Sequence, residues 1–421
     1  MDDIFYDALS KEAKSYTEPD TRIYRNPGKP SYGKVLIKSK YTGLIPFKKN
    51  TTSVEEYSLD LKFIEYKETN EFNISYTKMG DKGVLVLLLH GVPSNRRFGW
   101  ENIQRRLSPF CRTIAIDMLG MGESDKPRDY GINQKKENDI FEPWDWKNDV
   151  DYIDQIMKKI YGDEKFIFVA DDWGSGINTH FAAEKNDRLL AMIQLNPIAF
   201  DGYPVSEIQT IGRASKLEDK PFMMAMGNVD QTIVQILKTM VYDQNKFNQY
   251  TLRRIKQTYI DTDYDRSKHG PKGEDSTSLT LRLKYQNLRV LADRSAILSP
   301  ALLLPYHRSK NPKGVKYNKI TVPCLIIWGK RDNMMPAQQV HRFANVMYNS
   351  RVSITQIENA GHFAAFDQPD WVADAILNFI RQEFGVNNLA DIYLGMSNDS
   401  IWKGDEEEMI EDLRKIFKKN I

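Results

Sequence analysis

The chain has 421 residues, an apolar fraction of 41% and a net charge of +2. This charge gives no electrostatic reason to expect nucleic acid or an anionic membrane as a partner. No segment approaches the run of about 18 apolar residues that a membrane span needs. The acidic start, MDDIFYDALS, has neither an apolar signal core nor an Arg-rich transit pattern. We therefore expect no membrane span, with the cytoplasm as the default compartment.

Residues 1–55 are polar with little periodicity, and we interpret them as an N-terminal extension that lies over the surface or is partly disordered. From residue 56 onward, short β-branched and aromatic runs predict eight strands. These are Leu61–Tyr66, Phe72–Tyr76, Val84–Leu89, Arg112–Ile116, Phe166–Ala170, Ala191–Leu195, Val322–Trp328 and Val352–Ile357. Helical patterns lie between most of the later runs, at Asn148–Tyr161, Gly176–Glu184 and Trp371–Phe384. The alternation predicts an α/β fold with a mostly parallel eight-stranded sheet and helices on both faces, in which the first two runs could be antiparallel.

Residues 198–316 carry no strand signal, only helical patterns around 221–241, 246–260 and 277–297. A helical insertion at this point predicts a cap over the carboxyl ends of the strands, where ligands bind in such sheets. The methionines of the cap could line an adaptable apolar pocket, although ordinary helix packing explains them at least as well. They are Met223, Met224, Met226 and Met240.

The cap divides the predicted core into residues 56–197 and 317–385, and a C-terminal extension follows at 386–421. This extension ends in a predicted helix from about Asp405, whose apolar stripe we expect to dock on the body of the protein. A partner surface is the alternative. The two extensions are where a protein partner or self-association would be sought. Cys111 and Cys324 lie in or beside predicted strands, which favours core positions over a disulfide or a metal pair.

The strongest local signal is the segment FIFVADDWGSG at 166–176, in which an apolar strand runs into a sharp turn and then a helix. A strained turn that presents a nucleophile needs small residues two positions before and two after it. Centring on Asp172 gives Ala170 and Gly174, whereas centring on Asp171 or Ser175 places a bulky residue at one of these positions. The turn therefore presents the carboxylate of Asp172. An aspartate that merely caps the helix is the alternative.

Three further segments fall in the chain order expected around such a turn. VLVLLLHGVPS at 84–94 is a buried strand that ends in His-Gly-x-Pro, and the backbone N–H groups of Val92 and Trp173 would form an oxyanion hole. VPCLIIWGKRD at 322–332 leads to Asp332, and IENAGH at 357–362 leads to His362. We expect His362 to act as the general base and Asp332 to orient its ring. His90 is expected to be structural.

From about 80 to 385 the sequence resembles the epoxide hydrolase and haloalkane dehalogenase branch of the α/β-hydrolase superfamily. The Asp-Trp-Gly turn and the His-Gly-x-Pro motif carry this resemblance, and the loop DMLGMGES at 117–124 also matches it. The resemblance implies a hydrolase without cofactor or metal that forms a covalent ester on Asp172. It also implies a small apolar substrate of the epoxide or haloalkane type.

The two subclasses differ in how they hold the leaving group. In dehalogenases, two side-chain N–H donors hold the halide, and one of them resembles Trp173. The second donor has no counterpart here, because Val92 has no side-chain donor and residues 198–316 contain no tryptophan. Epoxide hydrolases use acidic hydroxyls, usually two cap tyrosines. The sequence offers Tyr203, Tyr242, Tyr250, Tyr259, Tyr264, Tyr285 and Tyr306 and selects no pair among them.

The leading hypothesis is thus hydrolysis through an Asp172 ester, with dehalogenation still open. The alternative is a catalytically idle fold that serves as a structural or interaction subunit, a hypothesis motivated by the two extensions. A serine hydrolase is disfavoured by the turn itself. No cluster has metal-ligand spacing, and Gly120 and Gly122 precede no phosphate-binding helix.

Overall fold

The computed structural model describes nine parts of the chain. These are residues 28–46, 66–127, 145–198, 200, 203–227, 233–247, 251, 288–335 and 337–384. The C-terminal helix predicted from Asp405 and most of the cap stretch 246–260 lie outside these residues, as does the charged part of the cap at 261–275.

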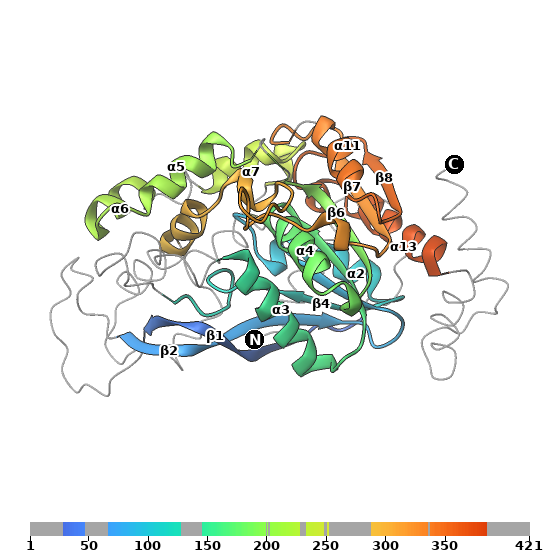
Figure 1. Cartoon of the computed structure of the whole chain (residues 1–421), viewed down its shortest axis with the longest axis horizontal. Coiled ribbons are helices and arrows are strands. Elements are labelled where there is room, and N and C mark those ends of the chain that lie inside the picture. Colours follow the sequence, from blue (N-terminus) through green and yellow to red (C-terminus); the bar gives the residue numbers. More distant parts are fainter. Residues whose placement is uncertain are drawn as a thin grey trace.

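The centre of the fold is an eight-stranded sheet with the order β1-β2-β4-β3-β5-β6-β7-β8 (Figure 1). The pairs β1–β2 and β2–β4 are antiparallel, and the remaining five pairs are parallel. The predicted α/β class with a mostly parallel eight-stranded sheet is thus confirmed. The strands are β1 (Ser31–Pro46), β2 (Tyr66–Met79), β3 (Leu85–Leu89), β4 (Arg112–Ile116), β5 (Phe166–Asp171), β6 (Leu189–Pro197), β7 (Cys324–Gly329) and β8 (Val352–Ile357).

The beginning of the sheet differs from the sequence prediction. The run predicted at Phe72–Tyr76 is part of one long strand, β2, and the edge strand β1 comes from residues 31–46. Interpreting all of 1–55 as an extension was therefore wrong for this part. In β1, Val35 and Ile37 are buried while Leu36 is exposed. In an edge strand with one solvated face, buried and exposed residues alternate in this way. The lysines that flank the apolar run of β1 hide the continuous apolar pattern that a central parallel strand shows.

Helices cover both faces of the sheet. One face carries α2 (Arg96–Leu107), α12 (Ala364–Asp367) and α13 (Pro369–Phe384), which pack on Val86, Leu88 and Val169 in one apolar layer. The other face carries α3 (Trp146–Tyr161), α4 (Asp172–Glu184) and α11 (Ala337–Val346), which belong to the layer that contains Leu87, Leu89 and Phe168. Alternate residues of the central strands thus pack into two separate apolar cores, because successive side chains of a strand point to opposite faces of the sheet.

The described part of the cap is helical, as predicted. It contains α5 (Ser206–Ala214), α6 (Asp219–Met226), α7 (Gln235–Met240) and a further helix at 288–296, with short 3-10 turns at Gln244–Lys246 and Pro300–Leu302. Met226 and Met240 are buried in the core, in keeping with the alternative of ordinary helix packing, whereas Met224 is 81% exposed. The cap is anchored by a buried ion pair from Arg294 to Asp149 of α3.

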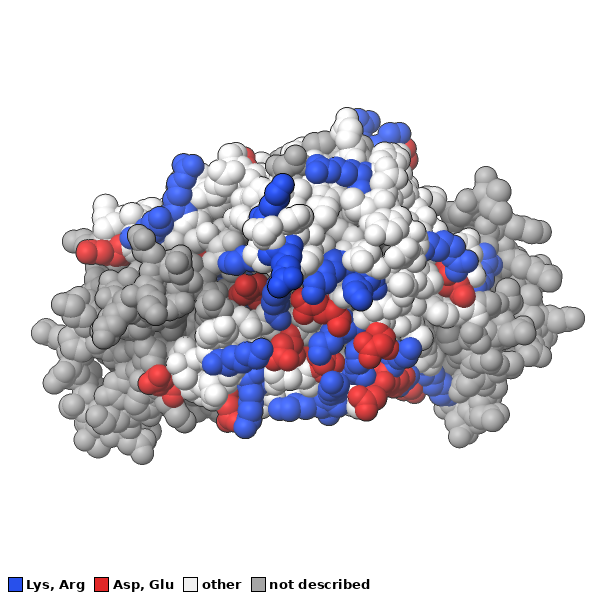
Figure 2. All heavy atoms as spheres, in the orientation of Figure 1, with Lys and Arg blue, Asp and Glu red and all other residues white. Residues whose placement is uncertain are grey.

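Charged side chains of both signs lie close together along the lower part of the face shown in Figure 2, in keeping with the net charge of +2. Within the described ranges, no helix combines the length and the apolar character needed to cross a membrane. Cys111 and Cys324 are both buried and free, as the sequence indicated.

Candidate active site

The turn between β5 and α4 has the geometry that the spacing of small residues predicted. Asp172 has a backbone φ of 45°, a strained value for a residue with a side chain. A Cβ added at Gly174 would lie 2.6 Å from the Leu89 carbonyl oxygen and 2.8 Å from that of His90. Ala170 is fully buried. The turn therefore leaves no room for larger side chains two positions either side of Asp172, and it projects that carboxyl group beyond the end of the sheet.

The carboxyl group of Asp172 lies between two of the other predicted site residues. Its Oδ2 accepts a hydrogen bond of 2.8 Å from the backbone N–H of Val92. Its Oδ1 lies 3.3 Å from Nε2 of His362. The backbone N–H of Trp173 belongs to the first turn of α4, where helix N–H groups have no carbonyl partner within the helix. The Asp172 side chain thus lies at the positive end of α4, with one oxygen facing the Val92 N–H and the other facing His362.

His362 connects this carboxyl group to the second predicted acid. Nδ1 of His362 lies 2.9 Å from Oδ2 of Asp332, so the Nδ1–H donates to the carboxylate and Nε2 faces Asp172. Asp332 Oδ1 accepts from the backbone N–H groups of Met334 and Met335, at 2.8 and 3.1 Å. The structure thus brings Asp172, His362 and Asp332 into one continuous chain of contacts.

The three groups shift one another's protonation. Burial acts to lower the pKa of His362, but Asp332 and Asp172 outweigh it and raise the pKa to about 10. Burial acts to raise the pKa of Asp332, yet the charge and hydrogen bond of His362, the Asn196 amide and the Met334 N–H bring it below its usual value. In the resting protein at neutral pH, His362 is therefore a cation held between two carboxylates.

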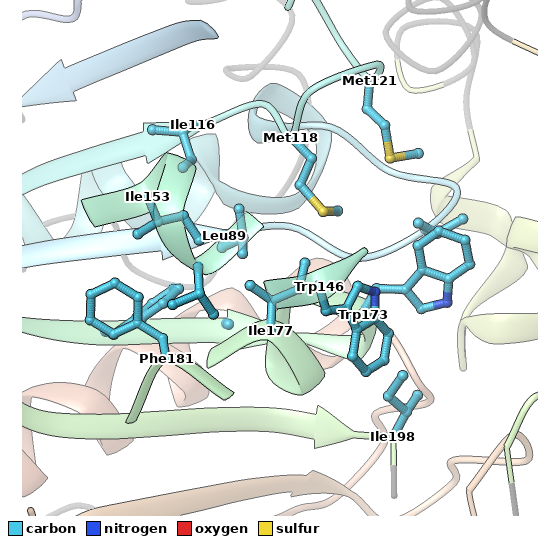
Figure 3. Close-up of a cluster of buried hydrophobic side chains, with 14 of the residues drawn as sticks. Leu89, Ile116, Met118, Met121, Trp146, Ile153, Trp173, Ile177, Phe181 and Ile198 are labelled. Carbon is cyan, nitrogen blue, oxygen red and sulfur yellow. The ribbon is translucent and has the colours of Figure 1, made fainter. Parts of the chain in front are cut away.

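Trp173 does not present its indole N–H to open space. The Nε1–H donates to the hydroxyl oxygen of Tyr203, which lies at the start of the cap and is buried. Burial and the charge of Asp172 raise the pKa of Tyr203 well above its usual value, although the Trp173 bond acts in the opposite direction. The indole itself belongs to the buried cluster that contains Trp146, Ile177 and Ile198 (Figure 3). Tyr203 therefore keeps its proton, and its oxygen already has a donor.

His90 has the structural role expected from the sequence. Its Nδ1 lies 2.7 Å from the Gly91 carbonyl oxygen, and its Nε2 accepts from the Met118 N–H at 3.1 Å. Burial is the largest cause that lowers its pKa, so the ring is neutral. Nearby, Arg96 forms a buried ion pair with Asp117. These contacts fix the loop after β3 against the loop after β4 and so hold Val92 in place.

Two further residues belong to the site and were not found from the sequence. Asn196, at the end of β6 with φ of 40°, donates from its side-chain amide to Oδ2 of Asp332 at 2.8 Å. Asp367 accepts from the backbone N–H groups of Gly361 and Tyr242, each at 2.8 Å, and thereby links the histidine loop to the cap. No local spacing marks either residue, because Asn196 acts on a segment far away in the chain and Asp367 joins the nearby Gly361 to the distant Tyr242. Among the described residues, no group of three or more His, Cys, Asp or Glu could hold a metal ion.

Comparison with known proteins identifies the family of the chain. The family model described as alpha/beta hydrolase fold matches residues 84–369, and the chain belongs to this family. Epoxide hydrolase 3 of Xenopus tropicalis is 24% identical over 340 residues, covering 77% of this chain and 79% of that protein. A haloalkane dehalogenase of Mesorhizobium japonicum is 33% identical over 119 residues, covering 28% and 34%. Within the superfamily, the chain is thus a member of the epoxide hydrolase and haloalkane dehalogenase-like branch.

Solved structures support the fold. The crystal structure of a haloalkane dehalogenase from Bradyrhizobium elkani superposes with a TM-score of 0.51 at 17% sequence identity, covering 74% of this chain and 95% of that one. The crystal structure of a thermophilic esterase from Thermogutta terrifontis gives 0.52 at the same identity, covering 75% and 95%. Because these two proteins carry different activities in their names, the architecture alone selects no substrate.

Proposed function

We propose that the protein hydrolyses a small apolar epoxide through a covalent ester on Asp172, with water activated by His362. The observation that carries this proposal is the placement of Asp172, which accepts from the Val92 N–H at 2.8 Å and lies 3.3 Å from His362 Nε2. One carboxylate thus has a donor that can stabilise an oxyanion and a base that can activate water next to it.

In the first step, an oxygen of Asp172 attacks a ring carbon of the epoxide. The carbon–oxygen bond of the ring breaks, and the departing oxygen takes the proton of the Tyr203 hydroxyl. Tyr203 suits this role because it stays protonated in the resting site and accepts a hydrogen bond from Trp173, which stabilises the phenolate as it forms. The step consumes the negative charge of Asp172 and yields a hydroxy-ester.

Ester formation changes the state of His362. Asp172 is one of the two carboxylates that raise the pKa of His362 to about 10. Once Asp172 is an ester, this contribution is gone, so the ring can release its proton, which restores the Tyr203 hydroxyl. The neutral ring is then the base that the second step requires.

In the second step, His362 takes a proton from water, and the hydroxide attacks the Asp172 carbonyl carbon. The resulting oxyanion lies at the N–H groups of Val92 and Trp173. Collapse breaks the bond between the Asp172 carbonyl carbon and the ester oxygen, so the oxygen that Asp172 contributed in the first step leaves with the substrate carbon as the second alcohol and takes the remaining water proton. Asp172 is again a carboxylate, one of whose oxygens comes from water, and His362 is again a cation. The net reaction is epoxide plus water to diol.

The same contacts favour an oxygen leaving group over a halide. A halide needs N–H donors that are free to point at it, and the Trp173 N–H is already donated to Tyr203. Val92 supplies no side-chain donor, and residues 198–316 contain no tryptophan. A protonated hydroxyl next to the nucleophile instead suits an oxygen that must be protonated as the ring opens.

The test is a single turnover in heavy-oxygen water with styrene oxide and with 1-bromobutane as probes, followed by mass analysis of the peptide that contains Asp172. We expect label in Asp172 with the epoxide, faster turnover of the epoxide than of the bromide, and trapped ester in His362→Gln. Asp172→Ala is the inactive control. Turnover that survives Asp172→Ala would exclude the ester scheme, and turnover of the bromide alone would exclude the epoxide assignment.

The idle-subunit alternative gives a different result in the same experiment, with neither turnover nor adduct for any probe. The extensions that motivate it were predicted at residues 1–55 and 386–421, and of these the structure describes only residues 28–46.

A further inference from the structure

The residue directly before the nucleophile is a second carboxyl group, and none of the steps above uses it. Asp171 is the last residue of β5 and is 3% exposed. It occupies the position before α4 where an aspartate usually accepts from the first helix N–H groups, yet its side chain makes no such bond. Its Oδ1 is buried and has no hydrogen-bond partner among the described residues. Asp171 is therefore not a helix cap.

The surroundings of Asp171 are apolar. Asp171 pairs with Leu195 of β6, and strand alternation places its side chain on the face that carries Val169 and Leu195. Both of these residues belong to the apolar layer beneath α2 and α13. Burial in this layer favours the neutral acid over the carboxylate, although the Gly91 N–H acts on the carboxyl group in the opposite direction.

The charged groups around Asp171 favour the same state. Asp172 carries a negative charge next to it, and His362 a positive one. The positive end of α4, the Val92 N–H and His362 all act directly on Asp172, so the second carboxylate gains little from them. Burial and Asp172 raise the pKa of Asp171 to about 8, although His362 and the Gly91 N–H act to lower it. Burial and the neighbouring charge thus both favour the neutral acid at Asp171.

We propose that Asp171 is a positioning residue that must be a neutral acid for the Asp172 ester to hydrolyse, so that its ionisation sets the alkaline limit of turnover. The inference rests on the proposed ester mechanism and deepens it. It assigns the alkaline limit to a group that does not touch the substrate.

Ionisation of Asp171 should slow ester hydrolysis without slowing ester formation. Ester formation removes the charge of Asp172, so an ionised Asp171 does not hinder it. Hydrolysis creates a new negative charge on the Asp172 carbonyl oxygen, and an ionised Asp171 beside it opposes that charge. In the ester the charge of Asp172 no longer raises the pKa of Asp171, so this pKa is lower than in the resting site. Above it, the ester should form normally and break down slowly. Because the ester then accumulates, kcat and KM fall together while kcat/KM stays level.

The experiment measures kcat, KM and the amount of ester on Asp172 between about pH 6 and pH 10, with styrene oxide as the probe. In the unchanged protein we expect kcat to fall about tenfold for each pH unit above the limit, with ester accumulating. Asp171→Asn keeps the shape of the side chain without an ionisable group, so its kcat should stay level over the same range. Asp163→Asn removes an exposed carboxylate, 93% exposed at its side chain, and should leave the alkaline limit unchanged.

A second measurement needs neither turnover nor ester. Infrared difference spectra of the unchanged protein should show a protonated carboxylic acid that is lost on titration near pH 8 and is missing from Asp171→Asn. Absence of this signal would overturn the proposal even if no probe is turned over. If the signal is present and ester forms on Asp172, but Asp171→Asn retains the alkaline fall in kcat, the proposal is also wrong. Failure of every probe with the infrared signal present would count against the proposed function alone and would still support a neutral Asp171.

Discussion

Substituting Gly174 tests whether Asp172 is the residue that the turn presents. In Gly174→Ala, the new methyl group would lie 2.6 Å from the Leu89 carbonyl oxygen and 2.8 Å from the His90 carbonyl oxygen. Both contacts are roughly 0.5 Å too short, and both involve the backbone at the buried end of β3, which cannot rotate away. Overpacking of this kind typically costs about 1–3 kcal/mol. The better helix propensity of alanine returns up to about 1 kcal/mol, so we expect a net loss of between about 0 and 3 kcal/mol.

The assay is urea unfolding, combined with the rate of ester formation. Relief of the clash must move the start of α4 away from the loop after β3, which lengthens the 2.8 Å bond from Val92 to Asp172 and should slow ester formation at least tenfold. Gly162→Ala is the matched control, because Gly162 has φ of 64° but nothing within 4 Å of an added Cβ. It should lose about 1 kcal/mol from backbone strain and keep full activity. The reasoning is refuted if Gly174→Ala is as stable and as fast as the unchanged protein.

Three further substitutions probe the contacts around the site. Asp332→Asn removes one of the two carboxylates that raise the pKa of His362, so the pKa of His362 should fall. We expect kcat to drop by about 10²–10⁴, measured across a pH series. Trp173→Phe removes the N–H donor to the buried tyrosine hydroxyl, and single-turnover kinetics should show epoxide opening slowed by about 10–100-fold, the equivalent of about 1–3 kcal/mol. Arg294→Met leaves Asp149 buried without its ion-pair partner, so unfolding at neutral pH should be easier by about 3–5 kcal/mol. This loss should shrink as the pH falls and Asp149 becomes neutral, and an equal loss at acidic pH would contradict the ion-pair explanation.

The nucleophile turn could be predicted from the sequence because its constraint is local. The turn crowds the positions two before and two after its central residue, whatever lies elsewhere. Among Asp171, Asp172 and Ser175, only Asp172 has small residues at both positions. His362 and Asp332 could be predicted because each stands in the loop after a predicted strand, and parallel strands end at the same edge of a sheet. Sequence order and burial were sufficient for these parts of the site.

The other contacts depend on segments that meet only in the folded chain. Tyr203 was one of seven tyrosines between residues 198 and 316, of which Tyr250, Tyr259, Tyr264 and Tyr285 lie outside the described residues. Among the three described, the hydrogen bond from Trp173 distinguishes Tyr203. Asn196 supports Asp332 from another strand, 136 positions away in the chain. Strand β1 was missed for a different reason. It is half solvated, and its short apolar run Val35–Ile37 is flanked by Lys34, Lys38 and Lys40, so that the segment looks polar in the sequence.

The buried carboxyl groups near the site show which contacts decide their charge. Asp367 accepts backbone N–H groups from Gly361, Tyr242 and Asp243, yet burial still raises its pKa. Asp332 is also buried, but its pKa is lowered. Both carboxylates receive backbone donors, so these donors alone do not account for the difference. Asp332 has in addition a cation in direct contact, His362 at 2.9 Å.

Asp332, Asp172 and Asp171 lie in one small site but differ in their contacts with His362. His362 touches Asp332 and Asp172, and the Oδ1 of Asp171 has no partner at all among the described residues. Both carboxylates stabilise the positive charge of His362, so the pKa of His362 stays raised only while both of them are charged. When Asp172 becomes an ester, one of the two is lost, and the proton on His362 is held by Asp332 alone. The reaction itself would thus convert His362 from an acid into a base, provided that Asp171 does not supply a replacement charge.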